Sequence, residues 1–500
     1  MRRLPLISFA LGLALTVAVG CGGSDKPEVG KDGKPVGPVD HTGAVVKPEA
    51  AALYNKGLAE MDRLDKAANG WTTETCGATA KIFLDAADAQ GKFFASAFYN
   101  AGVSYHRCNN IEEAKKLYKK VLDEDPKFHR ARVQIARFDL AASNDTATDA
   151  AMAEFERAIA DSEFQNVEAL VELARLQMRR NNNAEDKDGA NDFDRAKKNL
   201  QRALAVDDSY MPAFNQLALY YFERAKQAAG AKGTTPSRGG ATRSKVDSQA
   251  IDLALLVASQ GIRKNPNYAA IHNTAGLIYV ETGDLNNAVR RFGSARQLDP
   301  NFFEAHMNYA SVNMLFRGFN KAEEAYRAAI KLRPNDYDAQ LGLALSLRGQ
   351  IDTAPDSDAK LNEAEQLISK AQELDADRPE AYFNHAILVQ EYKSRAGGEA
   401  GNKALEQAIS LFEEFVKRAK GKPQFADAVE DVTAVPTKAD KDCLGPKAKE
   451  DKACKRGRIL DIKETIDFNR QSAAEQKKLE EEAKNRAALE EAGAADAAPQ

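Results

Sequence analysis

The sequence lacks the short motifs that mark common catalytic sites. Its 500 residues contain no HExxH pair of a metalloprotease, no phosphate-binding glycine loop and no nucleophile elbow. The charge is nearly balanced, since 70 basic and 74 acidic residues give a net charge of −4, and nothing favours nucleic acid. We therefore expect no enzyme activity, no cofactor, no metal site, no small-molecule substrate and no nucleic-acid partner.

Long hydrophobic runs are also scarce. One uncharged, Leu-rich stretch, residues 4–19, follows Arg2 and Arg3, has the plan of a secretory signal peptide and is too short to span a bilayer stably. It ends in Ala18-Val19-Gly20-Cys21, which resembles a bacterial lipobox, where cleavage frees the cysteine for lipid modification. This predicts a lipoprotein signal peptide over residues 1–20 and lipidation of Cys21; an ordinary signal peptide with a chance cysteine is the alternative.

The residues after Cys21 indicate in which membrane the lipid anchor would lie. Gly22 stands where an aspartate would favour retention, so the resemblance implies export to the outer membrane of a two-membrane bacterium, on its periplasmic face. Several acyl chains would anchor the protein stably. Residues 21–48 form the lipidated cysteine and a flexible tether, because they are rich in Gly, Lys, Asp and Pro; the tether would span about 30 Å on average.

An internal repeat dominates the rest of the chain. Pro300 and Pro334 lie 34 residues apart (334 − 300), and the same residue types recur before each of them. These are Gly276, Tyr279, Ala288, Phe292 and Ala295 in the first copy and Ala322, Tyr326 and Ala329 in the second. The spacing predicts two antiparallel helices per copy: small residues let them approach, aromatic rings fill the gaps, and the proline ends the second helix.

This framework resembles the tetratricopeptide repeat. Another complete copy lies at residues 95–128, and copies with insertions fill the remaining intervals of residues 49–420. The resemblance implies an all-α fold, a right-handed superhelical solenoid of about nine helical hairpins with a C-terminal helix. His272 occupies the position where the family usually has tryptophan, and His306 the equivalent position one repeat later. We expect a structural role for both, against the alternative of paired ligands.

The cysteines beyond Cys21 allow three pairings, and an oxidising periplasm permits disulfides. The repeat register places Cys76 in the second helix of the first hairpin and Cys108 in the next turn, so we predict that these two pair. Cys443 and Cys454 would then pair locally. Four free thiols are the alternative, and zinc is disfavoured because no pair has the spacing of zinc ligands.

The chain after the repeats divides into three segments. Residues 421–455 look irregular and contain Cys443 and Cys454. Residues 456–492 predict a charged helix, in which Ile459, Ile462 and Ile466 would cover the open end of the solenoid. The distal part of this helix is expected to be exposed to solvent, and packing against a helix of a partner is the alternative. Residues 493–500 are expected to be a disordered tail.

Two rows of side chains are candidates for partner binding. In the family, the concave groove is lined by the first helix of each hairpin, and helical spacing places both rows there. The rows are Arg107, Arg130, Arg137, Arg175 and Arg179, followed by Leu219, Phe222, Leu277, Met307 and Met314. The arginines would hold an acidic segment, and the apolar row would suit an amphipathic helix. Alternatively, either row is shielded by insertions or packed within the chain.

These features together predict a scaffold anchored to the outer membrane by its N-terminal lipid, which binds other envelope proteins or peptides. The plan of lipobox, tether and many repeats with insertions resembles the tetratricopeptide lipoprotein of a bacterial gliding-motility machine. The resemblance implies a place in such a multiprotein machine. The same plan suits a secretin pilotin, an outer-membrane assembly factor or a peptidoglycan-associated adaptor.

Overall fold

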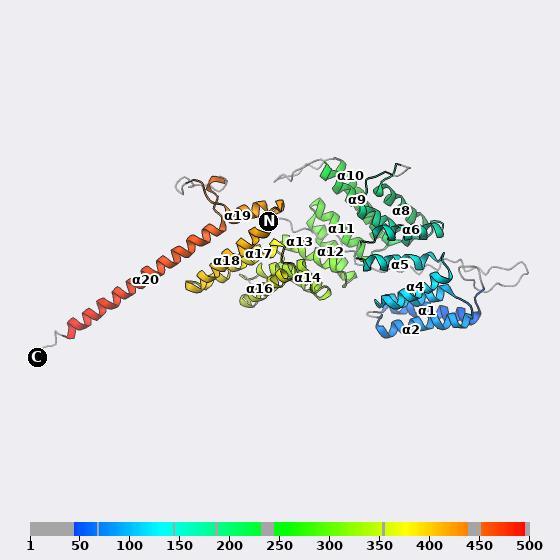
Figure 1. Cartoon of the computed structure of the whole chain (residues 1–500), viewed down its shortest axis with the longest axis horizontal. Coiled ribbons are helices and arrows are strands. Elements are labelled where there is room, and N and C mark those ends of the chain that lie inside the picture. The colour runs from blue at the N-terminus through cyan, green and yellow to red at the C-terminus, as the bar shows by residue number, and fades with distance from the viewer. Residues whose placement is uncertain are drawn as a thin grey trace, which may run out of the picture. The chain divides into compact units, whose positions relative to one another are not determined.

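The computed structural model of the chain describes residues 45–67, 70–143, 146–185, 189–231, 245–352, 356–438 and 452–495. These residues fall into two compact units that meet in the sequence between Leu298 and Asp299; we call 45–298 the first unit and 299–495 the second. Twenty α-helices follow one another through the described ranges, where no β-strand occurs (Figure 1). The all-α fold predicted from the sequence is confirmed.

Six helical hairpins make up the first unit, and the two helices of each pack against one another. The helices are α1 (Pro48–Lys66), α2 (Thr73–Gln90), α3 (Ala95–Arg107), α4 (Ile111–Glu124), α5 (His129–Ala142), α6 (Thr148–Asp161), α7 (Val167–Arg180), α8 (Asp192–Val206), α9 (Met211–Ala231), α10 (Lys245–Lys264), α11 (Ala269–Thr282) and α12 (Leu285–Leu298). The odd-numbered member of each pair is the first helix of its hairpin.

Three more hairpins and a C-terminal helix form the second unit, which brings the described hairpins to the nine predicted. The elements are α13 (Phe303–Leu315), α14 (Phe319–Leu332), α15 (Tyr337–Arg348), α16 (Ser357–Leu374), α17 (Pro379–Glu391), η1 (Lys393–Ala396), α18 (Gly398–Ala419), η2 (Pro423–Phe425), α19 (Ala426–Thr433), η5 (Lys452–Cys454) and α20 (Arg458–Ala495). Within the described ranges, no helix is both long enough and apolar enough to cross a bilayer. The predicted signal peptide, Cys21, Cys443 and nearly all of the tether lie outside these ranges.

A close contact between glycine and an aromatic ring joins the two helices of several hairpins. A Cβ atom added at Gly57 would lie 2.6 Å from the ring of Phe83, and one added at Gly276 would lie 2.5 Å from that of Phe292. Both rings are fully buried. The absence of a side chain therefore sets how closely the helices approach, as the repeat predicts.

The two repeat histidines hold the backbone of the preceding turn. Nε2 of His272 lies 2.8 Å from the carbonyl oxygen of Pro266, and Nε2 of His306 lies 2.9 Å from that of Pro300. Gln340 donates an equivalent bond of 2.8 Å to the carbonyl oxygen of Pro334. Since an amide does the same task one repeat later, the role of this position is structural.

The first hairpin contacts the residues that precede α1. The side-chain amide of Gln90, at the end of α2, accepts from the backbone N–H of Lys47 (2.9 Å) and donates to the carbonyl oxygen of Val45 (3.1 Å). Val46 between them is buried against α1 and α2. These contacts fix the last residues of the predicted tether on the first unit.

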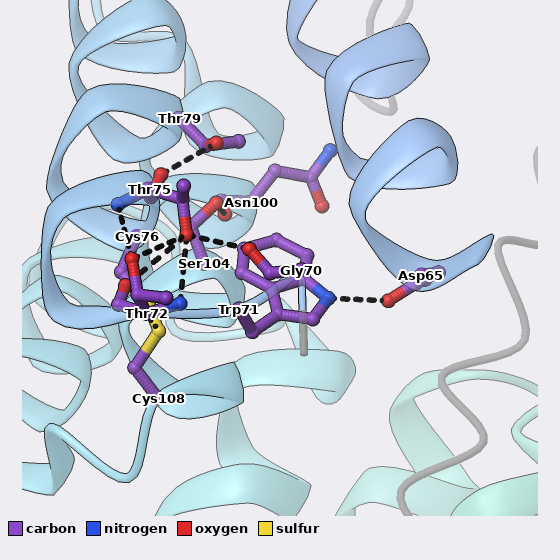
Figure 2. Close-up of a disulfide and its surroundings, with 10 residues drawn as sticks. All are labelled: Asp65, Gly70, Trp71, Thr72, Thr75, Cys76, Thr79, Asn100, Ser104 and Cys108. Carbon is purple, nitrogen blue, oxygen red and sulfur yellow. Dashed lines mark hydrogen bonds between the residues drawn. A yellow bond between two sulfur atoms is a disulfide. The ribbon is translucent and has the colours of Figure 1, made fainter. Parts of the chain in front are cut away.

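A disulfide joins the first hairpin to the second. Cys76 on α2 and Cys108 at the end of α3 are bonded, with their Cα atoms 6.3 Å apart (Figure 2). Beside them, Nε1 of Trp71 donates to Asp65 (2.7 Å) and ties the start of α2 to the end of α1. Cys454 is also disulfide-bonded; its predicted partner, Cys443, is not among the described residues.

The segment 421–455, predicted to be irregular, contains a helix. α19 forms there because Val432 is completely buried, in a cluster with Ile462 and Ile466 of α20. Tertiary burial outweighs the weak local signal of this short sequence. The same isoleucines pack with α17 and α18, whereas every residue from 471 to 487 of α20 is exposed.

Two glycines of the first hairpin should respond oppositely to alanine. Gly57→Ala should destabilise the hairpin by about 1–3 kcal/mol, because the new methyl group overlaps the Phe83 ring. Gly77→Ala on α2 meets no atom within 4 Å and should stabilise by about 0.5–1 kcal/mol through helix propensity. Urea unfolding monitored by Trp71, the single tryptophan, measures both; equal effects would contradict the close contact.

Removing the disulfide should weaken the first two hairpins. The bond closes a loop with a sequence separation of 32, so Cys76→Ala/Cys108→Ala should lower the free energy of unfolding by about 3 kcal/mol under oxidising conditions. Trp71 fluorescence reports unfolding of the hairpins next to the disulfide. Adding reductant should change the free energy of unfolding of the variant little. If reductant lowered the free energy of unfolding of the variant as much as that of the native protein, the stabilisation would come from another disulfide.

Candidate functional site

The predicted arginines lie on three consecutive first helices of the first unit, but the structure brings only some together. Arg130 and Arg137 are on α5, and Arg175 and Arg179 are on α7. Arg107, at the end of α3, contacts the first hairpin: its guanidinium donates to Asp65 (3.0 Å) and lies 6.0 Å from the centroid of the Trp71 ring. Arg107 thus supports the first hairpin.

A network of polar side chains crosses α3, α5 and α7, and we call it the first-helix ladder. Its members are Tyr99, Arg130, Gln134, Arg137, Glu168, Glu172 and Arg175. Nε2 of Gln134 donates to both carboxylate oxygens of Glu168, at 2.9 and 3.0 Å, and Arg137 donates to the same carboxylate at 2.5 Å. The guanidinium of Arg137 also lies 3.7 Å from Glu172, to which Arg175 donates at 2.9 Å.

The aromatic end of the ladder is Tyr99. Its ring is buried, and the Arg130 guanidinium lies 4.7 Å from the ring centroid, which orients that cation. Burial raises the pKa of Tyr99, and hydrogen bonds from Gln134 and Arg130 act in the opposite direction. The hydroxyl therefore stays protonated at neutral pH and adds no charge.

The ladder carries buried but ionised groups. Burial acts to raise the pKa of Glu172, yet the pKa is lowered overall because the guanidinium groups of Arg175 and Arg137 stabilise the carboxylate. Burial likewise acts to lower the pKa of Arg137, but Glu172 and Glu168 hold it above the usual value. Both partners keep their charges, so this part of the surface is fixed in position.

The formal charges do not cancel. The ladder contains three arginines and two glutamates, which leaves 3 − 2 = +1. Arg179 follows Arg175 by one turn on α7, is exposed, and raises the sum to +2. Its guanidinium contacts Thr148 at 3.3 Å. The first helices therefore present an excess of positive charge on a preorganised framework.

The predicted apolar row does not form an open strip. Leu219 and Phe222 on α9 are buried, as is Met307 on α13, while Leu277 and Met314 are half-buried. Leu219 and Phe222 belong to a core cluster shared with α7, α8, α10 and α11. The row is also divided, since Met307 and Met314 belong to the second unit. Packing within the chain, the alternative considered from the sequence, holds for the three buried residues.

Sequence reasoning missed the two glutamates that organise the ladder. Glu168 and Glu172 are four residues apart on α7, with Arg175 three and Arg179 seven residues beyond Glu172. Their helical spacing was a usable signal for one shared face. Reaching Arg137 and Gln134, however, needed the pairing of α5 with α7, which no local pattern provides.

With the geometry described, the chain can be compared with known proteins. The tetratricopeptide repeat family model matches residues 95–128, which form α3 and α4. The chain is 25% identical over 113 residues to the Hsp70-Hsp90 organizing protein of Triticum aestivum, covering 23% of this chain and 19% of that protein. It is 30% identical over 88 residues to serine/threonine-protein phosphatase 5 of Rattus norvegicus, covering 18% of each. It thus spans about a fifth of the length of these relatives.

Solved structures of similar proteins also cover part of the chain. A thermophilic tetratricopeptide repeat protein of Thermus thermophilus is 23% identical, covers 44% of this chain and 99% of its own, and has a TM-score of 0.35. The pilF protein of Pseudomonas aeruginosa is 16% identical, covers 50% and 95%, and has the same TM-score of 0.35.

Acid should weaken the first unit through His106, which lies beside the ladder. This side chain is buried edge-on against Phe138; burial, together with the positive charges of Arg137 and Arg107, lowers its pKa to about 4. The folded state therefore keeps it neutral, while the unfolded state takes up a proton near pH 6.5. Stability should fall by about 2 kcal/mol from pH 7 to pH 5 on this account.

Urea unfolding at both pH values, monitored by Trp71, measures this effect. His106→Phe keeps an aromatic ring against Phe138 but cannot titrate. The decrease in its free energy of unfolding between pH 7 and pH 5 should therefore be smaller than that of the native protein by about 2 kcal/mol. An equal loss in both proteins would show that other groups cause the acid sensitivity.

Proposed function

We propose that the first unit binds a protein or peptide segment with acidic side chains across α5 and α7. The observation that carries this proposal is the first-helix ladder, a hydrogen-bonded network with an excess of positive charge on consecutive first helices. Guanidinium groups bind carboxylates through paired, charge-assisted hydrogen bonds. The expected partner is therefore an acidic segment, which the protein binds without catalysing a reaction on it.

The ladder supports binding because part of it is already ordered. Glu168 and Glu172 hold Arg137 and Arg175 in place, so a ligand need not order these side chains and loses less entropy on binding. Arg130, held over Tyr99, and Arg179, exposed at the end of α7, flank them. An acidic segment would lie between these two arginines and leave the internal glutamates in their bonds.

The comparisons support a binding role in coarse terms. The matched repeat forms α3 and α4, and α3 supplies Tyr99 to the ladder. The wheat relative is named as an Hsp70-Hsp90 organizing protein. By this likeness we assign the present chain to protein binding, with a partner set by the acidic chemistry above.

We further propose that the protein works in the bacterial envelope. The N-terminal sequence supports this, through the signal peptide and lipobox around Cys21, with Gly22 favouring the periplasmic face of the outer membrane. The plan of anchor, tether and repeats supports a scaffold in a multiprotein motility machine; a pilotin, an assembly factor or a peptidoglycan-associated adaptor would use the same plan.

Reversing the two flanking arginines should weaken binding of an acidic probe. The probe is a fluorescein-labelled peptide of glutamates, followed by anisotropy over a salt series. Arg130→Glu/Arg179→Glu should reduce affinity at least about tenfold, since two charge-assisted contacts are lost. Arg157→Glu is the matched control, because its side chain is 64% exposed on α6, a second helix.

The same variants test the partner in cells. Crosslinked complexes from membrane-fractionated envelopes should lose partners in the double variant and keep them in Arg157→Glu. Unchanged circular dichroism and Trp71 fluorescence establish that both variants fold. Equal probe affinity in the double variant and the control would refute the proposed surface.

A further inference from the structure

The turn between α13 and α14, in the second unit, exposes two large apolar side chains. Leu315 is 56% exposed and Phe316 is 48% exposed, and Met314 before them is half-buried. We call Met314, Leu315 and Phe316 the apolar tip. Single exposed apolar side chains are common on protein surfaces, but here two neighbours project together from one tight turn.

Two other tight hairpin turns in the described ranges are built differently. The turn after α3 consists of Cys108, Asn109 and Asn110, and the turn after α11 contains Gly283 and Asp284. These residues are small or polar, as is usual for turns. The repeat framework therefore does not need apolar residues at this position, and folding alone does not account for the tip.

The backbone holds the tip in one conformation. The N–H groups of Phe316 and Gly318 donate to the carbonyl oxygen of Asn313, at 3.1 and 2.9 Å, and the N–H of Arg317 donates to that of Met314 at 3.1 Å. Arg317 has a φ of +57°, in the left-handed region. Asn313 is itself buried, with its amide donating to the carbonyl oxygen of Tyr309 (2.8 Å).

These bonds fix the backbone of Leu315 and Phe316 at the turn, where both side chains are exposed. The tip is a preformed apolar projection. A rigid projection of this kind loses little conformational entropy when it is buried against another surface.

The turn itself carries positive charge. From Met314 to Ala322 the sequence contains two cations, Arg317 and Lys321, and no acid, and the acids Glu323 and Glu324 follow on α14. Both cations are exposed. Apolar and aromatic side chains flanked by cations are the combination that binds the interface of an anionic bilayer, where the rings enter the acyl boundary and the cations meet phosphates.

We propose that the apolar tip inserts into the surface of an anionic lipid bilayer, with Arg317 and Lys321 at the headgroups. This rests on the proposed envelope location, since the predicted lipid on Cys21 and its tether would keep a membrane within reach. A lipid anchor alone leaves the protein free to turn. Insertion of the tip adds a second contact and fixes the side of the second unit that faces the membrane.

The test uses tryptophan as a depth probe in the full chain, purified from the membrane fraction. Trp71→Phe provides the background, and Phe316→Trp places the probe on the tip. Phe164→Trp is the matched control, because Phe164 is 49% exposed but lies in the first unit. Each protein is mixed with vesicles of phosphatidylethanolamine and phosphatidylglycerol that carry brominated acyl chains, which quench tryptophan on contact.

Fluorescence of the Phe316→Trp protein should fall by about half or more, because the tip reaches the acyl boundary, while the Phe164→Trp protein should change little. Brominated phosphatidylcholine, which has no net charge, should quench the tip less. Adding Arg317→Glu/Lys321→Glu should reduce quenching by the anionic vesicles. Equal quenching at both positions, or none at position 316 in vesicle-bound protein, would overturn the proposal.

Two further measurements separate the proposals. Mass spectrometry of the N-terminal peptide reports the acyl group on Cys21. Quenching without the acyl group would refute the lipid anchor and support insertion of the apolar tip. An acyl group without quenching would support the anchor and refute insertion of the tip. Sedimentation velocity tests self-association. A dimer that Leu315→Ser/Phe316→Ser abolishes, in protein that vesicles do not quench, would assign the tip to a second copy and overturn the lipid proposal.

Discussion

The contact of a glycine backbone with a buried aromatic ring is the constraint on which several of the hairpins depend. At Gly57 and Gly276 no side chain separates the helices, so the rings of Phe83 and Phe292 fill the space between them. The spacing of the two helices then determines which faces remain for the next hairpin. An array of such units buries its core through neighbouring contacts.

The first-helix ladder shows how this stacking produces a surface. α3, α5 and α7 come from three hairpins, yet their polar side chains meet in one hydrogen-bonded network. Glu172 remains charged in a confined position because Arg175 and Arg137 compensate for its burial. The network is therefore part of the structure and also a source of positive charge, so that a partner meets groups whose positions are already set.

The sequence predicted the local units well and the lateral contacts poorly. Gly276, Phe292 and Pro300 could be placed from the sequence because two contacts that involve them, Gly276 with Phe292 and Pro300 with His306, lie within one repeat length. The arginine row was placed on the right helices, but its pairing with Glu168 and Glu172 depends on which helix lies opposite. Leu219 and Phe222 were predicted either to form an apolar strip or to pack within the chain, and they are buried, because α7 and α11 both contact α9. Periodicity shows which way a side chain points, not how closely the next helix approaches.

The disulfide between Cys76 and Cys108 also determines how the protein transmits force. Tension on the chain ahead of α1 reaches Gln90 through its bonds to Val45 and Lys47 and so acts on α2. A hairpin array pulled from one end would release its terminal hairpin first, since that hairpin has a single neighbour. Here a covalent bond joins α2 to α3, so load that reaches Cys76 passes directly to Cys108, and residues 77–107 between them carry none of it.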